Sequence, residues 1–252
     1  MPNSGIARYQ MILAYDGAQF RGFQRQGKAR TVQAVVEAAL RQLGWTGRTI
    51  LSAGRTDTGV HASGQVIACD LAWTHSPQEL ARALNAHLPE DVAVRSVRVA
   101  DVAFHPRYDA VSRTYHYHLF SEPERTPLRE RYAWRVWPPL NADILPVAAS
   151  TLVGTHDFAA FGAPQKPGGP TVRQVFRAEW LEEAGGLRFE ICANAFLYHM
   201  VRRLVYLQVQ AAQQRITIEE LAAGVQTASP QMPGLAPPHG LTLVEVAYAA
   251  GE

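Results

Sequence analysis

The sequence predicts an α+β protein with a mixed, mostly antiparallel sheet and helices on one face. First, the chain has 252 residues, 47% apolar and 18% charged, which is enough for one large domain or two of about 125 residues. Second, segments of alternating apolar residues, typical of strands, are interspersed with segments whose apolar residues repeat every three or four positions, typical of helices. This composition excludes a mainly disordered chain.

Up to the strand at 92–99, the first half of the chain has the order strand, helix, strand, strand, helix, strand. Asp16-Gly17 stops the first strand, Thr31 can cap the first helix, and Ser76 with Glu79 three residues later has the pattern of a helix N-terminus. This order is that of a split βαβ unit, the ferredoxin-like or RRM-like half. Strands are expected at 8–15, 49–53, 65–73, 92–99 and 111–120, and helices at 31–43 and 76–88.

The second half predicts another α+β unit. Helices are expected at 142–152, 198–214 and 218–226, and strands at 172–182, 187–193 and 241–248. Between the halves, the segment 122–139 is irregular and rich in proline and arginine, which favours a boundary. We therefore expect an N-terminal half at 1–121, a linker at 122–139 and a C-terminal half at 140–252.

Location and redox state follow from what the chain lacks. No segment approaches the roughly 18 uncharged apolar residues that cross a bilayer, and the first ten residues lack the apolar core of a signal peptide. A cytoplasmic protein is expected. Cys69 and Cys192 have no neighbouring cysteine, so the sequence indicates neither a disulfide framework nor a zinc finger.

A basic segment at 21–30 contains four cations and no acid, with phenylalanines beside the cations. The net charge of +2 neither demands nor excludes nucleic acid, but cations and aromatic rings in one loop suit contacts with phosphates and bases. The alternative is a solvated loop whose phenylalanines fill the core. The cations are Arg21, Arg25, Lys28 and Arg30, and the rings are Phe20 and Phe23.

The densest candidate site is the segment 52–65, SAGRTDTGVHASGQ, where three glycines surround Arg55, Asp57 and His61. A P-loop is excluded because no Gly-Lys-Ser/Thr follows the glycines. Arg55 and Asp57 stand two apart, so in an extended loop both project from one side. A guanidinium there keeps the carboxylate ionised. A structural clamp that braces the turn is the alternative.

Two further segments carry candidate side chains. In the strand around 113–120, Tyr115 and Tyr117 share one face and His116 and His118 the other. A tyrosine can stack on a base or fill the core, and the two histidines have no third ligand nearby in sequence, so we expect no metal.

In the helix beginning at 198, Arg202 and Arg203 stand beside an apolar stripe. They can be solvated residues of the helix surface, or they can hold a phosphate or a carboxylate.

Six segments in order resemble the tRNA pseudouridine synthase A family over essentially the whole chain: YDGAQFRGFQRQ, TVQAVVEAAL, GRTDTGVHASGQV, FHPRYDAVSRTYHYHL, FLYHMVRRLV and APPHGLTLVEV. The resemblance implies that Asp57 is the catalytic aspartate and that Arg55 pairs with it. It implies that Tyr115 stacks on the target base, that Arg202 is a second active-site arginine and that Leu241 lines the base pocket. Substrate binding is also expected of Arg21, Phe23, Arg25, Lys28, Arg30, His61 and Arg203.

The family fold implies two α+β halves that form a continuous sheet with a basic central cleft, in a homodimer. The implied activity is isomerisation of uridine to pseudouridine at positions 38, 39 and 40 of the tRNA anticodon stem-loop. The reaction oxidises nothing and adds no atoms, so no cofactor or metal is expected. The sequence leaves open whether Asp57 attacks C1′ or removes the C2′ proton.

Two other function classes stay open on the residues alone. One is a nucleoside or glycoside hydrolase that uses Asp57, although the segment contains no second carboxylate. The other is a non-catalytic tRNA-binding or chaperone protein. The chain also departs from the family at Tyr206 and Gln210, where glycine is usual, which leaves helix packing there open.

Overall fold

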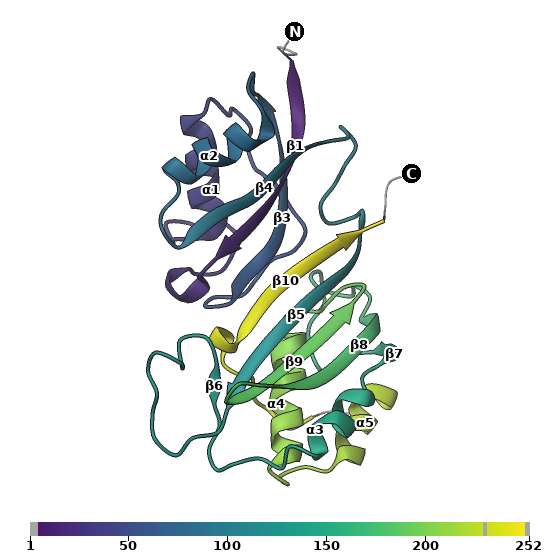
Figure 1. Ribbon diagram of the computed structural model, residues 1–252. Helices are drawn as coiled ribbons and strands as arrows, with labels where there is room; N and C mark the ends of the chain where they lie inside the picture. The colour runs from purple at the N-terminus through teal and green to yellow at the C-terminus, as the bar shows by residue number, and fades with distance from the viewer. Residues whose placement is uncertain (1–4, 229–230, 250–252) are drawn as a thin grey trace. The chain divides into compact units, whose positions relative to one another are not determined.

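The computed structural model describes residues 5–228 and 231–249. The chain forms two compact units, Met1–Val111 with Leu243–Glu252, and Ser112–Thr242. Each unit contains strands and helices (Figure 1), so the predicted α+β class is confirmed. No helix in the described part of the chain is long and apolar enough to span a membrane.

The first unit is an antiparallel sheet in the order β4-β1-β3 with two helices on one face (Figure 1). In the register, Tyr9 of the central strand lies opposite Cys69 on one side and Val99 on the other. The elements are β1 (Ile6–Tyr15), η1 (Gly17–Gln19), α1 (Val32–Gln42), β2 (Leu51–Ser52), β3 (His61–Ala72), α2 (Pro77–His87) and β4 (Val92–Ala100).

The core of this unit lies between the sheet and the helices. One stripe of each helix is buried, as the helical periodicity predicts, whereas β3 is buried at nine of its 12 residues. The helix starts are also as predicted: the Thr31 hydroxyl accepts from the Ala34 N–H, and Ser76 and Glu79 form a capping box. The core includes Met11, Leu13, Ile67, Leu71, Val36, Leu40, Leu80 and Leu84, all at most 2% exposed.

The second unit has the strand order β5-β9-β8-β7 with antiparallel neighbours, and the short β6 pairs in parallel with β5. Helix α4 lies against one face of β9 and β8 (Figure 1), and the Trp180 indole N–H donates to the Gln208 side chain at 2.8 Å. The elements are β5 (Ala110–Phe120), β6 (Trp134–Arg135), α3 (Ile144–Ser150), β7 (Gly154–Asp157), β8 (Val172–Glu183), β9 (Gly186–Ala193), α4 (Met200–Ala212), α5 (Ile218–Thr227) and η2 (Pro238–Gly240). The last strand, β10 (Leu241–Tyr248), begins in this unit, and its residues from Leu243 belong to the first unit.

The chain divides into units at a different place from the predicted linker. The division falls after Val111, inside β5, and the C-terminal residues from Leu243 return to the first unit. The segment 122–139 belongs to the second unit, where Leu119 pairs with Trp134 and the Arg129 guanidinium donates to Glu122 at 2.8 Å. The proline-rich segment 122–139 is therefore a loop of the second unit that is held by strand pairing and by an ion pair. A continuous sheet through both halves and a basic cleft stay predictions.

The two departures from the family pattern have local explanations. The ring of Tyr206 lies against Gly234, where an added Cβ would be only 2.2 Å from the ring. Gln210 is buried, and its side-chain oxygen accepts from the Arg215 guanidinium at 3.0 Å. Both side chains therefore have packed positions in α4.

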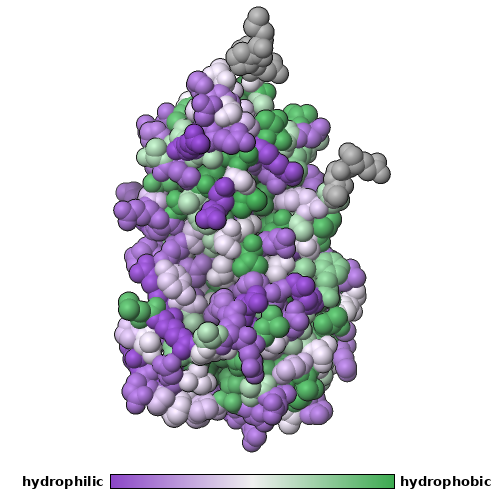
Figure 2. All heavy atoms as spheres, in the orientation of Figure 1, coloured by the Kyte–Doolittle hydropathy of each residue, from purple (hydrophilic) through white to green (hydrophobic). Residues whose placement is uncertain are grey.

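Side chains at the surface are mixed in character. On the face shown in Figure 2, hydrophilic residues are spread over the surface and hydrophobic ones are scattered among them.

Candidate active site

The loop that carries Asp57 connects β2 to β3 and is held at Thr56 by two hydrogen bonds. The Tyr15 hydroxyl and the Thr56 hydroxyl are 2.8 Å apart, and the Phe23 N–H donates to the Thr56 carbonyl at 3.1 Å. Gly22, with φ of +84°, allows this close approach, because a Cβ there would lie 2.9 Å from the Thr56 carbonyl oxygen. Thr56 is buried and Asp57 is half-buried. A rigid backbone therefore presents a partly accessible carboxylate.

Arg55 and Asp57 differ in exposure. Arg55 is exposed, whereas Asp57 is half-buried. The extended-loop geometry that would place both on one side ends at Asp57, whose carbonyl accepts from the Val60 N–H in a turn. The pairing of Arg55 with Asp57 stays a prediction.

His61 is buried at the start of β3, 5% exposed. Its Nδ1 lies 3.0 Å from the Gly17 nitrogen and 3.1 Å from an Asp16 carboxylate oxygen. Nδ1 accepts from Gly17 when neutral and donates to Asp16 when protonated. In both states His61 links the turn after β1 to the start of β3, and a contact of His61 with the substrate stays a prediction.

The basic segment 21–30 is partly neutralised by acids from elsewhere in the unit. Arg25 pairs with the fully buried Glu37 at 2.6 Å, and Arg30 pairs with Asp91 through both terminal nitrogens. The rings of Phe20 and Phe23 are at most 2% exposed. The core-filling alternative is therefore confirmed for both rings, and a stacking role of Phe23 has no support. All four cations, Arg21, Arg25, Lys28 and Arg30, are exposed, and Arg25 and Arg30 are the two that pair with these acids.

We expect Arg21 and Lys28 to carry the contribution of this segment to tRNA affinity. Changing both to glutamine should reduce the salt dependence of tRNA binding by about 0.7 to 0.9 in log–log slope for each phosphate contact removed, without changing stability. Binding titrations at several salt concentrations measure the slope.

The matched control changes Arg25 to glutamine. It removes a partner from the buried Glu37 carboxylate, so it should lower the free energy of unfolding by about 1 to 2 kcal/mol. An unchanged slope for the Arg21 and Lys28 variant would assign this segment to the solvated-loop alternative.

In the second unit, the candidate residues lie around the N-terminal end of α4. The Tyr115 ring meets Phe196 edge-on, with centroids 5.1 Å apart at 88°. Arg202 is tied twice to one residue: its Nε donates to the Ala236 carbonyl at 2.8 Å, and its carbonyl accepts from the Ala236 N–H at 3.1 Å. The segment before β10 is thereby attached to the helix.

Tyr117 is a buried residue of β5 that holds the segment before β10. It is fully buried, which raises the pKa of its phenol well above the usual value, although the nearby Arg202 charge opposes this. Its hydroxyl donates to the Pro237 carbonyl at 2.8 Å. Gly240 lies on its ring, where a Cβ would be 2.7 Å away. Tyr115 and Tyr117 are two residues apart on β5, so their side chains lie on the same face of the strand.

Leu241 follows Gly240 directly and is 5% exposed, in keeping with a wall residue. Arg203 donates to the carbonyls of Gly234 and Gln231 at 3.0 and 3.2 Å. Its guanidinium therefore holds the same connecting segment as Arg202, and a direct substrate contact stays a prediction.

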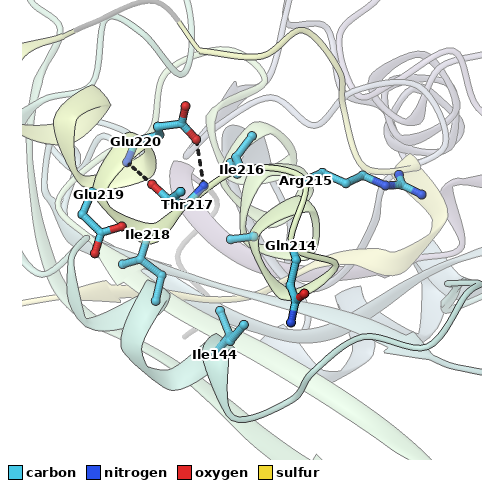
Figure 3. Close-up of a pocket in the computed structure, with 9 residues that line it drawn as sticks. Ile144, Gln214, Arg215, Ile216, Thr217, Ile218, Glu219 and Glu220 are labelled. Carbon is cyan, nitrogen blue, oxygen red and sulfur yellow. Dashed lines mark hydrogen bonds between the residues drawn. The ribbon is translucent and has the colours of Figure 1, made fainter.

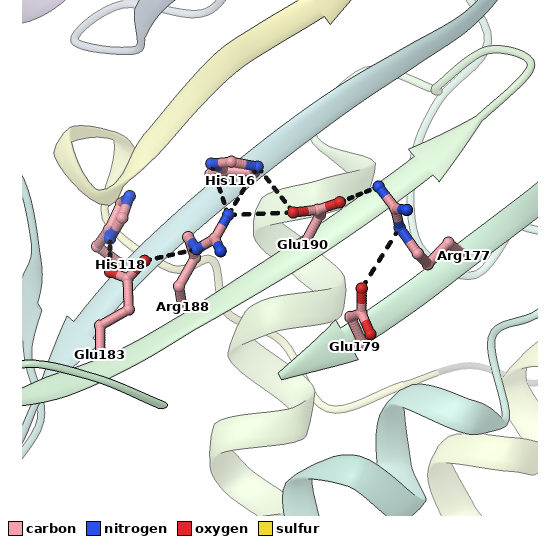
Figure 4. A network of polar contacts seen from close by, with 7 residues as sticks. All are labelled: His116, His118, Arg177, Glu179, Glu183, Arg188 and Glu190. Carbon is pink, nitrogen blue, oxygen red and sulfur yellow. Dashed lines mark hydrogen bonds and ion pairs between the residues drawn. The ribbon is translucent and has the colours of Figure 1, made fainter. Parts of the chain in front are cut away.

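His116 and His118 belong to a polar network on the opposite face of the β5-β9-β8 sheet (Figure 4). His116 contacts Glu190 at 3.0 Å and Arg188 at 3.1 Å, and His118 contacts Glu183 at 3.2 Å. Burial lowers the pKa of both imidazoles, and the Arg188 charge lowers it further. These histidines are partners of carboxylates and an arginine on a sheet surface.

This network predicts that the protein becomes less stable in mild acid. Folding lowers the pKa of both histidines, so their neutral forms favour the native state. This stability is fully present above the unfolded pKa of about 6.5 and is lost as pH falls through the folded pKa. We expect the free energy of unfolding in urea to fall less between pH 7.5 and pH 5.5 for the double variant H116Q/H118Q than for the wild type. The exposed His87→Gln is the control, and an equal loss in the double variant would contradict this explanation.

A pocket of about 370 Å³ lies between α3, the end of α4 and the start of α5 (Figure 3). The Thr217 and Glu220 side chains accept from each other's backbone N–H groups, at 3.1 and 2.8 Å. These bonds satisfy donors at the start of α5. None of the predicted site residues lines this pocket.

Comparison with known proteins decides the family. The family model described as tRNA pseudouridine synthase matches residues 11–109 and 148–249. The chain belongs to the tRNA pseudouridine synthase family. The two matched ranges of the chain include Asp57, Arg202 and Leu241. Tyr115 lies in the segment between the two ranges.

Relatives named tRNA pseudouridine synthase A cover nearly the full chain. The one from Neisseria gonorrhoeae is 40% identical over 245 residues, 96% of this chain and 92% of its own. The one from Bacillus subtilis is 37% identical over 244 residues, 96% of this chain and 99% of its own. Membership of the family makes the protein an isomerase that acts on tRNA.

Proposed function

We propose that this protein converts uridine to pseudouridine at positions 38, 39 and 40 of the tRNA anticodon stem-loop, as a cytoplasmic homodimer, with Asp57 starting the reaction. The observation that carries the proposal is the match to the family over most of the chain, with relatives that align over 96% of it. The half-buried Asp57 on a fixed loop supports it.

The reaction cuts the bond from C1′ to N1, turns the detached uracil, joins C5 to C1′ and removes the C5 proton. One ionised carboxylate is enough to start the isomerisation, because the detached uracil itself rejoins the ribose and no second reactant has to be activated. Asp57 either forms a bond to C1′ or takes the C2′ proton. The rigid backbone around Thr56 supports this role, since a fixed nucleophile or base needs little reorganisation.

The second unit supplies the groups that hold the base. A stacked uridine must leave the stem-loop to react, and an aromatic ring can hold its face. We assign this role to Tyr115, whose ring orientation is supported by Phe196. Arg202, fixed through its Nε, provides a charged group for phosphate or the base, and Leu241 provides an apolar wall.

Incubation with unmodified tRNA that contains uridine at position 38, 39 or 40 tests the proposal. We expect pseudouridine at these positions and no free uracil. Release of uracil would favour a hydrolase, because the detached base must stay bound to rejoin the ribose. Tight tRNA binding without turnover would favour a non-catalytic RNA-binding protein.

A further inference from the structure

His199 has a backbone conformation that its position does not explain. Among the described residues other than glycine, positive φ occurs at His199 (68°), Gln214 (58°) and Ala228 (51°). Gln214 follows the last turn of α4 and Ala228 ends α5, where the left-handed conformation is common. His199 instead precedes the first turn of α4, where an extended residue is usual.

The surrounding structure holds His199 in this conformation. Tyr198 is bridged to Ala163 by two backbone hydrogen bonds, of 2.9 and 3.3 Å. On the other side, the His199 carbonyl accepts from the Arg203 N–H at 3.0 Å, and Met200 is fully buried. Glycine would adopt this conformation without steric cost. Strain of this kind is concentrated at functional sites, which indicates that the imidazole is needed.

The imidazole lies flat on an exposed tyrosine. The rings of Tyr198 and His199 are stacked, with centroids 3.6 Å apart at 27°, and Tyr198 is 56% exposed. Leu197 is buried, so Phe196 and Tyr198 project from the other side of the same extended segment. Phe196 contacts Tyr115, the tyrosine that we propose holds the base. Tyr198 follows Phe196 by two residues, so the stacked pair lies close to Tyr115 along this segment.

We propose that Tyr198 and His199 form a second stacking surface for RNA, which takes an unpaired nucleobase next to the target uridine. Aromatic rings bind bases through stacking without strong sequence preference. Arg202 in the first turn of α4 adds positive charge near the pair. The inference rests on the proposed function, because it requires an RNA substrate.

His199→Gly separates a binding role from a structural one. Glycine relieves the strain and removes the ring, so the melting temperature should stay equal or rise. KM for an anticodon stem-loop RNA should rise about tenfold, the effect of losing one base–ring stack, with kcat within about twofold of the wild type. Tyr198→Leu should have the same effect on KM, and Tyr198→Phe should retain wild-type KM.

Gln214→Gly is the matched control, because it relieves the same backbone strain at the other end of α4. Its KM should equal that of the wild type. A stem-loop with 2-aminopurine beside the target uridine gives a direct readout: its fluorescence should be quenched by the full-length protein and recover in Tyr198→Leu.

Wild-type KM in His199→Gly, or a clearly lower melting temperature, would overturn the proposal, because the imidazole would then be dispensable or structural. Quenching that persists in Tyr198→Leu would also overturn it. Lack of pseudouridine formation by the wild type contradicts the proposed function instead, and quenching is measured independently of turnover.

Discussion

Asp57→Asn should abolish pseudouridine formation and leave the fold and tRNA affinity intact. The amide keeps nearly the same shape as the carboxylate, but it is neither a nucleophile nor a base at neutral pH. The hydrogen bond from the Val60 N–H to the Asp57 carbonyl is a backbone contact, so the substitution preserves it. We expect a loss of at least about 10² to 10⁴ in rate, the range attributed to acid–base groups, measured in single-turnover assays.

Asp70→Asn is the matched control for this substitution. Asp70 is a carboxylate of the same unit that pairs with Arg8 at 2.7 Å on β3, away from the loop. It should retain wild-type turnover. If Asp57→Asn keeps more than about a hundredth of the wild-type rate, another group starts the reaction.

Most of the fold could be predicted because its signals are local. The capping box at Ser76 and Glu79 and the apolar stripe of α1 depend on residues within one or two turns, and both appear as expected. The strand β7 was missed because GTHD has no apolar alternation and forms only by pairing with β8. The division into compact units is not a local property, because the C-terminal residues from Leu243 return to the first unit over a long separation in sequence.

The site was predictable in its residue types but less so in its contacts. Arg25 and Arg30 look like free cations in the sequence, yet Glu37 and Asp91, distant in the chain, neutralise them. The sequence leaves open whether Phe23 contacts a base or fills the core, and the structure shows its backbone paired with Thr56 and its ring in the core. The strand periodicity places Tyr115 and Tyr117 on one face. It does not predict which of the two is buried under the segment before β10, and the structure shows that it is Tyr117.

Tyr115→Phe distinguishes stacking from proton transfer. The substitution keeps the ring that meets Phe196 and removes only the hydroxyl. If the hydroxyl helps to remove the C5 proton, the variant should bind tRNA normally and stall after the bond from C5 to C1′ forms. We expect a loss of about 10² or more in rate. A deuterium isotope effect with 5-deuterated uridine should also become visible, because breaking the C5–H bond then limits turnover.

Tyr117→Phe is the matched control, because it removes a hydroxyl from the same strand and face. That hydroxyl donates to the Pro237 carbonyl, so its loss should lower the free energy of unfolding by about 1 kcal/mol and produce no isotope effect. Wild-type turnover by Tyr115→Phe would reject the proton-transfer role and leave stacking as the contribution of Tyr115. Equal losses in Tyr115→Phe and Tyr115→Leu, with weaker tRNA binding in both, would make Tyr115 a structural residue, because a purely stacking ring tolerates loss of the hydroxyl but not of the ring.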